Sequence, residues 1–255
     1  MTLRLGAAQM FITNSVATNT STILRTAEEA RLKGVDLLVF PEMCLTGYDK
    51  KTLGQPGIEE ELGRALELIG SQVEKLKIGL IIGRAEFKDR KMYNAASVIL
   101  PDGVKYTYYK IHLTAAEEKF FTPGTQPLSF TYNGHRFGVI ICRDQNYPEL
   151  ARSSCPEGTS ALFILSAHYY NPAEARWKLT KNRALPIARA VENHCYVLLA
   201  NAVGSHIGLI SLGNSLIADP EGALVALADE ASETLITCDI PGEHPQLAPG
   251  DERAV

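Results

Sequence analysis

Short apolar runs alternate with helical patterns along nearly the whole chain. Leu3–Met10 and Asp36–Phe40 have the length and apolar character of buried strands. Between them, Ile23, Ala27 and Ala30 recur at spacings of 4 and 3 residues, which predicts a helix with one apolar face. This order predicts a strand, a helix and a second strand at the start of the chain.

Residues that favour helix ends mark the limits of this first helix. Asn19 or Thr20 is the predicted N-cap, and Gly34 is the predicted end. A second helix is expected over Ile58–Leu76. A later helical pattern runs from Trp177 to Val191 and contains Pro186, which is expected either to kink the helix or to divide it in two.

The remaining apolar runs predict further strands, and the turn 101–103 predicts a hairpin. Pro101, Asp102 and Gly103 have the turn chemistry that joins two antiparallel strands. The expected strands are Ile78–Gly83, Ala95–Leu100, Val104–Lys110, Phe137–Ile141, Ala161–Leu165, Tyr196–Ala200, Ser215–Ala218, Ala223–Leu227 and Thr234–Cys238. This regular alternation predicts a layered α/β protein whose strands are covered by helices.

The length, composition and charge of the chain argue against several classes of protein. The chain has 255 residues and 45% hydrophobic content, so we expect residues 1–255 to form a single domain. A net charge of −4 argues against a nucleic-acid or anionic-membrane binder, whose surface would be basic. No apolar run approaches the roughly 18 residues of a membrane span.

The five cysteines are scattered and odd in number, and none belongs to a C-x-x-C pair. A disulfide framework or a cysteine-rich zinc site is therefore not expected. The N-terminus enters a strand pattern directly and lacks the charged and apolar regions of a signal peptide. A reducing cytoplasm is the expected compartment, and it would keep a reactive thiol reduced.

Three reactive side chains lie at the ends of predicted strands. Glu42 follows an apolar run and a proline, Lys110 ends the run KYTYYK, and Cys142 ends the run FGVII. Each has a plainer interpretation: an exposed loop carboxylate, a solvated lysine and a small buried thiol. A helix expected after Cys142 would place the thiol close to positive helix-end potential and so favour its thiolate form.

Together, however, the three groups form a usable acyl-transfer site. The thiol can attack an electrophilic carbon, and the carboxylate can take its proton and later protonate a leaving amine. The ammonium group and the backbone N–H of Arg143 can stabilise the tetrahedral oxyanion.

The chain resembles the nitrilase superfamily, the carbon–nitrogen hydrolases, along nearly its whole length. The resemblance rests on AAQM, FPEMCLTGY, YYKIHL, EEKFFTPG, GVIICRDQNYPE, RAVENHCYVLLANAVG and IADPEG, which occur in the family's order. It implies that Glu42 is the general base and acid, that Lys110 stabilises the oxyanion and that Cys142 is the nucleophile. It also implies a four-layer α-β-β-α sandwich, and a homodimer or higher homo-oligomer formed through helices near the nucleophile.

Relatives often carry a second glutamate between the lysine and the cysteine. The spacing to Phe121 and Gly124 matches Glu117 to this position, and Glu118 is the competitor. Such a carboxylate would orient Lys110 and the substrate without taking protons. The alternative for each residue is a solvated charge on a loop.

Four further residues are candidates for substrate binding. Arg143 stands where relatives commonly have an aromatic residue, and it could bind a substrate carboxylate or pair with Asp144 or Glu149 as scaffold. His168 lies in the connection after the buried strand Ala161–Leu165, and relatives use this connection to line the site. Its alternative is a loop histidine without a special role. The tyrosines expected to shape the pocket are Tyr48 and Tyr147, although buried tyrosines are also ordinary core residues.

The sequence therefore predicts a thiol-dependent hydrolase that cleaves a small linear amide through a thioester. The same three residues would serve an N-carbamoyl-amine hydrolase or a true nitrilase, and the motifs do not separate these activities. The alternative of another class is a non-catalytic binding or regulatory relative. No metal or organic cofactor is expected, and the expected partner is a small-molecule substrate.

Overall fold

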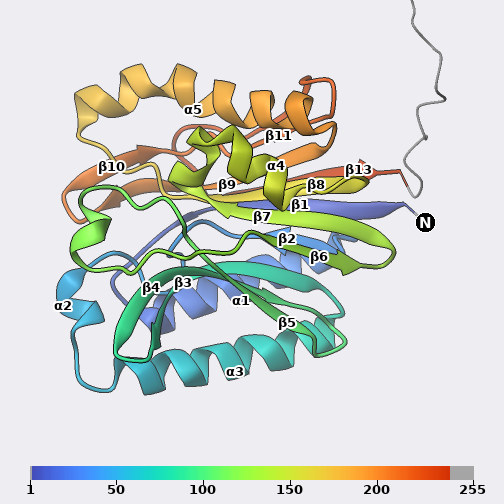
Figure 1. The fold of residues 1–255 in the computed structure, drawn as a ribbon. Coiled ribbons are helices and arrows are strands. Elements are labelled where there is room, and N and C mark those ends of the chain that lie inside the picture. Colours follow the sequence, from blue (N-terminus) through green and yellow to red (C-terminus); the bar gives the residue numbers. More distant parts are fainter. Residues whose placement is uncertain (1, 242–255) are drawn as a thin grey trace, which may run out of the picture.

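Two β-sheets face each other, and helices cover their outer sides (Figure 1). The computed structural model describes residues 2–241. In spatial order, the first sheet contains β5 (Lys105–Tyr109), β4 (Lys91–Ile99), β3 (Gly79–Lys88), β2 (Leu37–Val39), β1 (Leu3–Phe11) and β13 (Thr234–Ile240). The second contains β6 (Leu128–Tyr132), β7 (His135–Ile141), β8 (Thr159–Ser166), β9 (Tyr196–His206), β11 (Leu216–Ala218) and β12 (Leu224–Leu227).

The long strand β9 joins the two sheets. Its middle pairs with β1 at Ala202 and Val203, and its end pairs with β10 (Leu209–Leu212). The pairs β1–β2, β2–β3, β7–β8 and β8–β9 are parallel, so their carboxyl ends point to one side of each sheet. This arrangement brings the loops that follow β2, β7 and β8 to the same end of the molecule.

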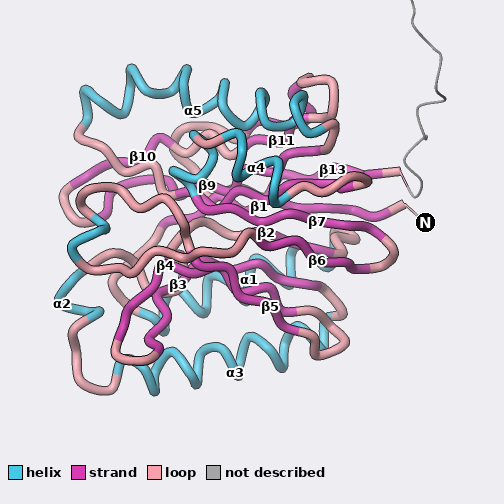
Figure 2. Tube along the Cα trace, viewed as in Figure 1, coloured by secondary structure: helices cyan, strands magenta, loops and turns pink. Residues whose placement is uncertain are grey.

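Helices lie on both outer faces, and the strands lie between them (Figure 2). The helices are α1 (Val16–Leu32), α2 (Lys50–Leu53), α3 (Ile58–Leu76), α4 (Pro148–Ser154) and α5 (Pro172–Asn193). Helices α1 and α3 pack on the first sheet, and α4 and α5 pack on the second. The predicted four-layer α-β-β-α sandwich is thus confirmed.

The alternation of side chains along each strand gives three separate apolar layers. In β1, Leu5 and Ala7 face the second sheet, whereas Ala8 and Met10 face the helices. In β7, Val139 faces the first sheet. Because successive strand residues point to opposite faces, a strand covered on both sides is apolar throughout. This explains the continuous apolar runs in the sequence.

The sequence predicted the ends of some helices and strands correctly and the ends of others incorrectly. The helix over Ile58–Leu76 and the hairpin at Pro101–Gly103 are confirmed. The predicted caps Asn19 and Thr20 are wrong, because α1 begins earlier and its N-cap is Ser15, whose hydroxyl accepts from the Thr18 N–H. The Asn19 side chain instead bonds the Thr13 backbone.

The long helix α5 runs unbroken through Pro186, so the predicted division into two helices is wrong. Asn171 caps its start with a hydrogen bond to the Glu174 N–H. Among residues 2–241, no helix combines the length and the apolar character that a membrane span requires.

One glycine in β3 sets the position of the loop that carries Glu42. A Cβ atom on Gly83 would lie 2.4 Å from the Met43 nitrogen and the Pro41 oxygen, and 2.7 Å from the Glu42 Cα. These neighbours are backbone atoms and cannot rotate away. Glycine at position 83 therefore allows the loop after β2 to pack directly on β3.

We predict that Gly83→Ala destabilises the protein by about 1–3 kcal/mol, because overpacking at a backbone contact forces the chain apart. The matched control is Gly63→Ala in α3, where an added Cβ meets nothing within 4 Å. That change should stabilise the protein by roughly 0.5–1 kcal/mol, as expected for an open helix position. Chemical denaturation of both variants measures the difference, and equal free energies of unfolding would contradict the packing argument.

Candidate active site

Three strand ends bring the predicted reactive groups together. Glu42 follows β2, Lys110 directly follows β5, and Cys142 directly follows β7. The Lys110 Nζ lies 2.7 Å from Glu42 Oε1. Both groups act electrostatically on the Cys142 thiol. Lys110 and Cys142 line one cavity of about 300 Å³, which we call the Cys142 cavity.

Lys110 is the buried centre of the site. Only 1% of its surface is exposed, and its Nζ donates to Glu42 and to both carboxylate oxygens of Glu117, at 2.7 and 2.9 Å. Burial lowers the pKa of Lys110, but the negative charges of Glu42 and Glu117 outweigh it and raise that pKa overall. Lys110 is therefore a fixed cation.

Glu42 is held by three donors from three parts of the chain. Its Oε1 accepts from Lys110 and from Asn94 Nδ2 at 2.8 Å, and its Oε2 accepts from the Ala167 N–H at 3.0 Å. Burial raises the pKa of Glu42, and Lys110 only partly offsets this effect. A buried carboxylate with a raised pKa suits a group that takes a proton and returns it.

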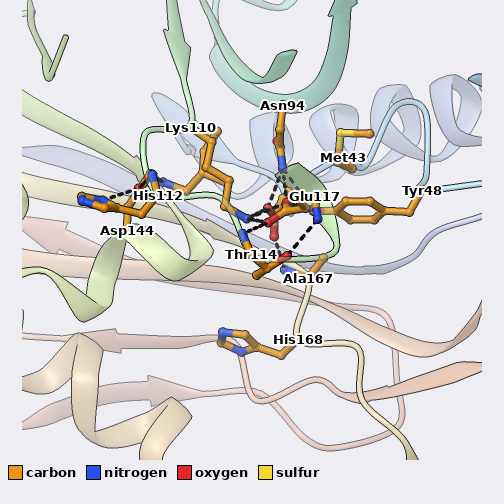
Figure 3. Close-up of polar contacts among 12 residues, drawn as sticks. Met43, Tyr48, Asn94, Lys110, His112, Thr114, Glu117, Asp144, Ala167 and His168 are labelled. Atoms are coloured by element: carbon orange, nitrogen blue, oxygen red, sulfur yellow. Dashed lines mark hydrogen bonds and ion pairs between the residues drawn. The ribbon is translucent and has the colours of Figure 1, made fainter. Parts of the chain in front are cut away.

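The second carboxylate of the site is Glu117. It lies in a short 3₁₀ helix, Glu117–Lys119, and accepts from Lys110, from the Thr114 N–H at 2.9 Å and from Asn94 at 3.0 Å (Figure 3). Although burial raises the pKa of Glu117, Lys110 lowers it overall. Its competitor Glu118 is exposed. Glu117, and not Glu118, is therefore the carboxylate that forms the ion pair with Lys110.

Cys142 has an unusual backbone conformation. Its φ is +47°, in the left-handed region, and a short 3₁₀ helix, Cys142–Asn146, begins there. The buried Asp144 fixes this turn, because its carboxylate accepts from the Ile141 N–H, the His112 N–H and the Tyr108 hydroxyl. The strained turn presents the thiol at the end of β7.

The expected stabilisation of a Cys142 thiolate by a helix end is wrong. Burial raises the pKa of the thiol, and the charges of Glu42 and Glu117 raise it further. Lys110 and the Ala167 N–H lower it by less. The resting group is a neutral thiol, so attack requires transfer of its proton to a base.

Cys142 is partly buried, whereas the other four cysteines of the described chain are buried. Cys44 is the nearest to Glu42 in sequence, but it is fully buried in the layer between the first sheet and its helices. Its thiol donates to the Gly83 carbonyl at 3.4 Å, and burial raises its pKa to about 12. Cys142 alone among the five lines the cavity.

Three of the four predicted substrate-binding residues line the Cys142 cavity: His168, Tyr48 and Arg143. Burial lowers the pKa of His168 to about 3, with further lowering by Lys181, Lys110 and Lys178, so His168 is neutral. Figure 3 shows its ring apart from the Lys110 cluster. The Tyr48 hydroxyl donates to Glu117 at 3.3 Å.

Two of the expectations for these residues need correction. Tyr147 does not line the Cys142 cavity, because its ring stacks on His112 with a centroid distance of 3.5 Å. Arg143 does not pair with Asp144 or Glu149. Its side chain is exposed, and its Nη2 reaches the Tyr147 hydroxyl at 3.5 Å. Arg143 therefore lies at the edge of the cavity.

Sequence reasoning missed Asn94 and Ala167. The Asn94 Nδ2 donates to Glu42, to Glu117 and to the Tyr48 hydroxyl, so one amide connects the two carboxylates. The available signal in the sequence was a polar asparagine directly before the apolar run AASVIL, and in the structure this asparagine is buried. Ala167 acts through its backbone N–H, a group that every residue except proline has, so its residue type gives no signal of this role.

Several polar residues of α5 and of the segment before it also line the cavity and were not predicted. They are Tyr170, Lys178, Lys181 and Asn182. Lys178 pairs with Glu174, whereas Lys181 has no carboxylate partner among the residues described. Across residues 2–241, no three His, Cys, Asp or Glu side chains are arranged to hold a metal ion.

Comparison with known proteins agrees with this geometry. The family model for carbon-nitrogen hydrolases matches residues 4–247. A nitrilase of Pyrococcus abyssi is 33% identical over 84% of this chain and 79% of its own length. A 2-oxoglutaramate amidase of Bacillus subtilis is 32% identical over 78% and 75%, respectively.

Among solved structures, an amidase of Nesterenkonia sp. AN1 has the same fold. The two structures superpose with a TM-score of 0.84 at 23% identity, over 94% of this chain and 93% of the amidase. The family match covers nearly the whole chain, and the relatives are amidases and nitrilases. The chain therefore belongs to the carbon-nitrogen hydrolase family of the nitrilase superfamily, as an amidase-like member.

Proposed function

We propose that this protein hydrolyses a small linear amide through a cysteine thioester. The observation that carries the proposal is the buried Lys110, which bonds Glu42 and Glu117 beside a cavity-lining thiol. This arrangement supplies a nucleophile and a fixed positive charge in the Cys142 cavity, and a base that is bonded to that charge. These are the three groups that acyl transfer from an amide needs.

In the first half of the reaction, the Cys142 sulfur attacks the amide carbonyl carbon as Glu42 takes the thiol proton. The carbonyl oxygen becomes an oxyanion, which Lys110 and the Arg143 backbone N–H stabilise. Glu42 then gives the proton to the departing nitrogen, the C–N bond breaks and ammonia or an amine leaves. Cys142 keeps the acyl group as a thioester.

In the second half, Glu42 takes a proton from water, and the resulting oxygen nucleophile attacks the thioester carbon. The C–S bond breaks, the carboxylic acid leaves and the proton returns to the thiol. Glu117 stays ionised throughout and holds Lys110 in place. Its lowered pKa supports this role, because a proton on Glu117 would weaken the ion pair.

The relatives support an amide as the first substrate to try. One variant of the Nesterenkonia amidase carries acrylamide added to its active-site cysteine, and another variant was solved with butyramide. The Cys142 cavity, at about 300 Å³, lies at the small end of ligand-site volumes, which suits such compact molecules. Nitriles and N-carbamoyl amines remain alternatives because the same three groups serve their hydrolysis.

The direct test is ammonia release from butyramide, butyronitrile and an N-carbamoyl amine. Wild type should release ammonia from butyramide, and Cys142→Ala should lose at least about 10⁴-fold in kcat/KM because the nucleophile is gone. The control is Cys238→Ala, which removes a thiol from β13, outside the site, and should keep the activity. Equal background for wild type and Cys142→Ala would favour a non-catalytic binding protein.

The pH dependence of kcat/KM should reflect the ionisation of the Glu42 carboxyl group. Activity needs ionised Glu42, so it is lost as the pH falls through the pKa of this carboxyl. Because burial raises that pKa, the acid limb should lie above the ordinary value of about 4.3. A butyramide profile from pH 4 to 9 measures the limb. Full activity at pH 4 would contradict the role of Glu42 as base.

Asn94 should act as a positioning residue through Glu42. Asn94→Ala removes one donor to the ionised carboxylate, which raises the Glu42 pKa further and moves the acid limb to higher pH. Asn193→Ala removes a hydrogen bond at the end of α5 and touches neither carboxylate, so its limb should stay in place. If both variants kept the wild-type limb, Asn94 would have only a structural role.

A further inference from the structure

A second and larger cavity lies next to the Cys142 cavity. Its volume is about 870 Å³, within the range of small-molecule sites. It is bounded by α2, by the β3–β4 turn, by the segment 116–121 and by Ile207. We call it the Phe120 cavity. Of the residues proposed to carry the hydrolysis, only Glu117 lines it, whereas Cys142, Lys110 and Glu42 do not.

The floor of this cavity is apolar. Leu53 and Phe121 belong to a small core cluster, against which Phe87 and Met92 pack, and all four line the cavity. Phe120 lines it as well and is 40% exposed. Water against so much apolar surface is unfavourable, and a ligand that covers the surface gains free energy.

The mouth of the cavity is cationic, although the chain as a whole carries a net charge of −4. The cationic side chains that line it are Lys50, Lys88, Arg90, Lys91 and Lys119, against the acids Glu59, Asp89 and Glu117, of which Glu117 is already paired with Lys110. Among the residues described, none of these cations forms an ion pair, and the Lys50 ammonium lies 3.9 Å from the centre of the Phe120 ring. The mouth therefore has unused positive charge.

The boundary between the two cavities includes a hydrogen-bonded pair of side chains, Tyr48 and Glu117. The lining residues that the two cavities share are Tyr48, Ala116, Glu117 and Ile207. Tyr48 and Glu117 bond each other, and both bond Asn94. Parting Tyr48 and Glu117 would break contacts that hold Lys110, so a ligand in the Phe120 cavity does not reach Lys110 between these two side chains, and we treat it as a second molecule beside the amide.

We propose that the Phe120 cavity binds an amphipathic monocarboxylate, with its apolar chain on the floor and its carboxylate among the lysines of the mouth. An uncharged apolar molecule would leave the cations unpaired. A compact polyanion would leave the aromatic floor exposed to water. A carboxylate at the end of an unbranched chain matches both surfaces.

The test uses decanoate as the probe and isothermal titration calorimetry as the measurement. Wild type should bind one equivalent saturably. The double variant Lys50→Glu/Lys119→Glu reverses two charges at the mouth and should bind about ten-fold more weakly. The matched control is Lys51→Glu, an exposed neighbour on α2 that does not line the cavity, and it should bind within about two-fold of wild type.

Decan-1-ol and a chemically blocked protein complete the test. Decan-1-ol has the same tail without the charge, so the double variant should change its affinity by less than about two-fold. Protein alkylated at Cys142 by iodoacetamide should still bind decanoate, which separates this site from the proposed hydrolysis.

Several results would overturn the proposal: no saturable binding by wild type, equal affinity of the double variant and Lys51→Glu, equal weakening of decanol and decanoate, or loss of binding on alkylation. If the double variant fails to fold, Met92→Trp fills the cavity instead. It should weaken decanoate binding about ten-fold, and unchanged binding would overturn the proposal equally.

Discussion

The buried ion cluster of Lys110, Glu42 and Glu117 is the interaction on which the site depends. Charges taken out of water are expensive unless they are paired and hydrogen-bonded. Here one ammonium group meets two carboxylates, Asn94 donates to the same Glu42 oxygen as Lys110, and the Ala167 N–H donates to the other Glu42 oxygen. Removing one partner of such a cluster typically costs about 3–5 kcal/mol, so the protein retains all three charges together.

The fold supplies this cluster through the ends of its strands. The two sheets bring the ends of β2, β5 and β7 to one edge. The close packing of the Glu42 loop on Gly83 fixes how deep in the protein Glu42 lies. The same cluster sets the behaviour of Cys142. Burial and the two carboxylates raise the pKa of the thiol and Lys110 lowers it by less, so the thiol proton must pass to a base before the sulfur attacks.

Much of this was predictable from the sequence because it depends on local pattern. Apolar periodicity predicted the helix over Ile58–Leu76, and strand ends predicted the approach of Glu42, Lys110 and Cys142. What failed depends on partners distant in the chain. The role of Asn94 follows from the register of β4, and the raised pKa of the thiol is a sum over groups from four segments.

In the proposed mechanism the acyl group passes through a thioester on Cys142. Hydroxylamine intercepts thioesters, so product analysis of butyramide turnover in rising hydroxylamine is a sharp test of this intermediate. Butyrohydroxamic acid should replace butyric acid as the product, and alkylation of Cys142 should abolish both. Steady ammonia release with butyric acid as the only acyl product at every hydroxylamine concentration would contradict this mechanism.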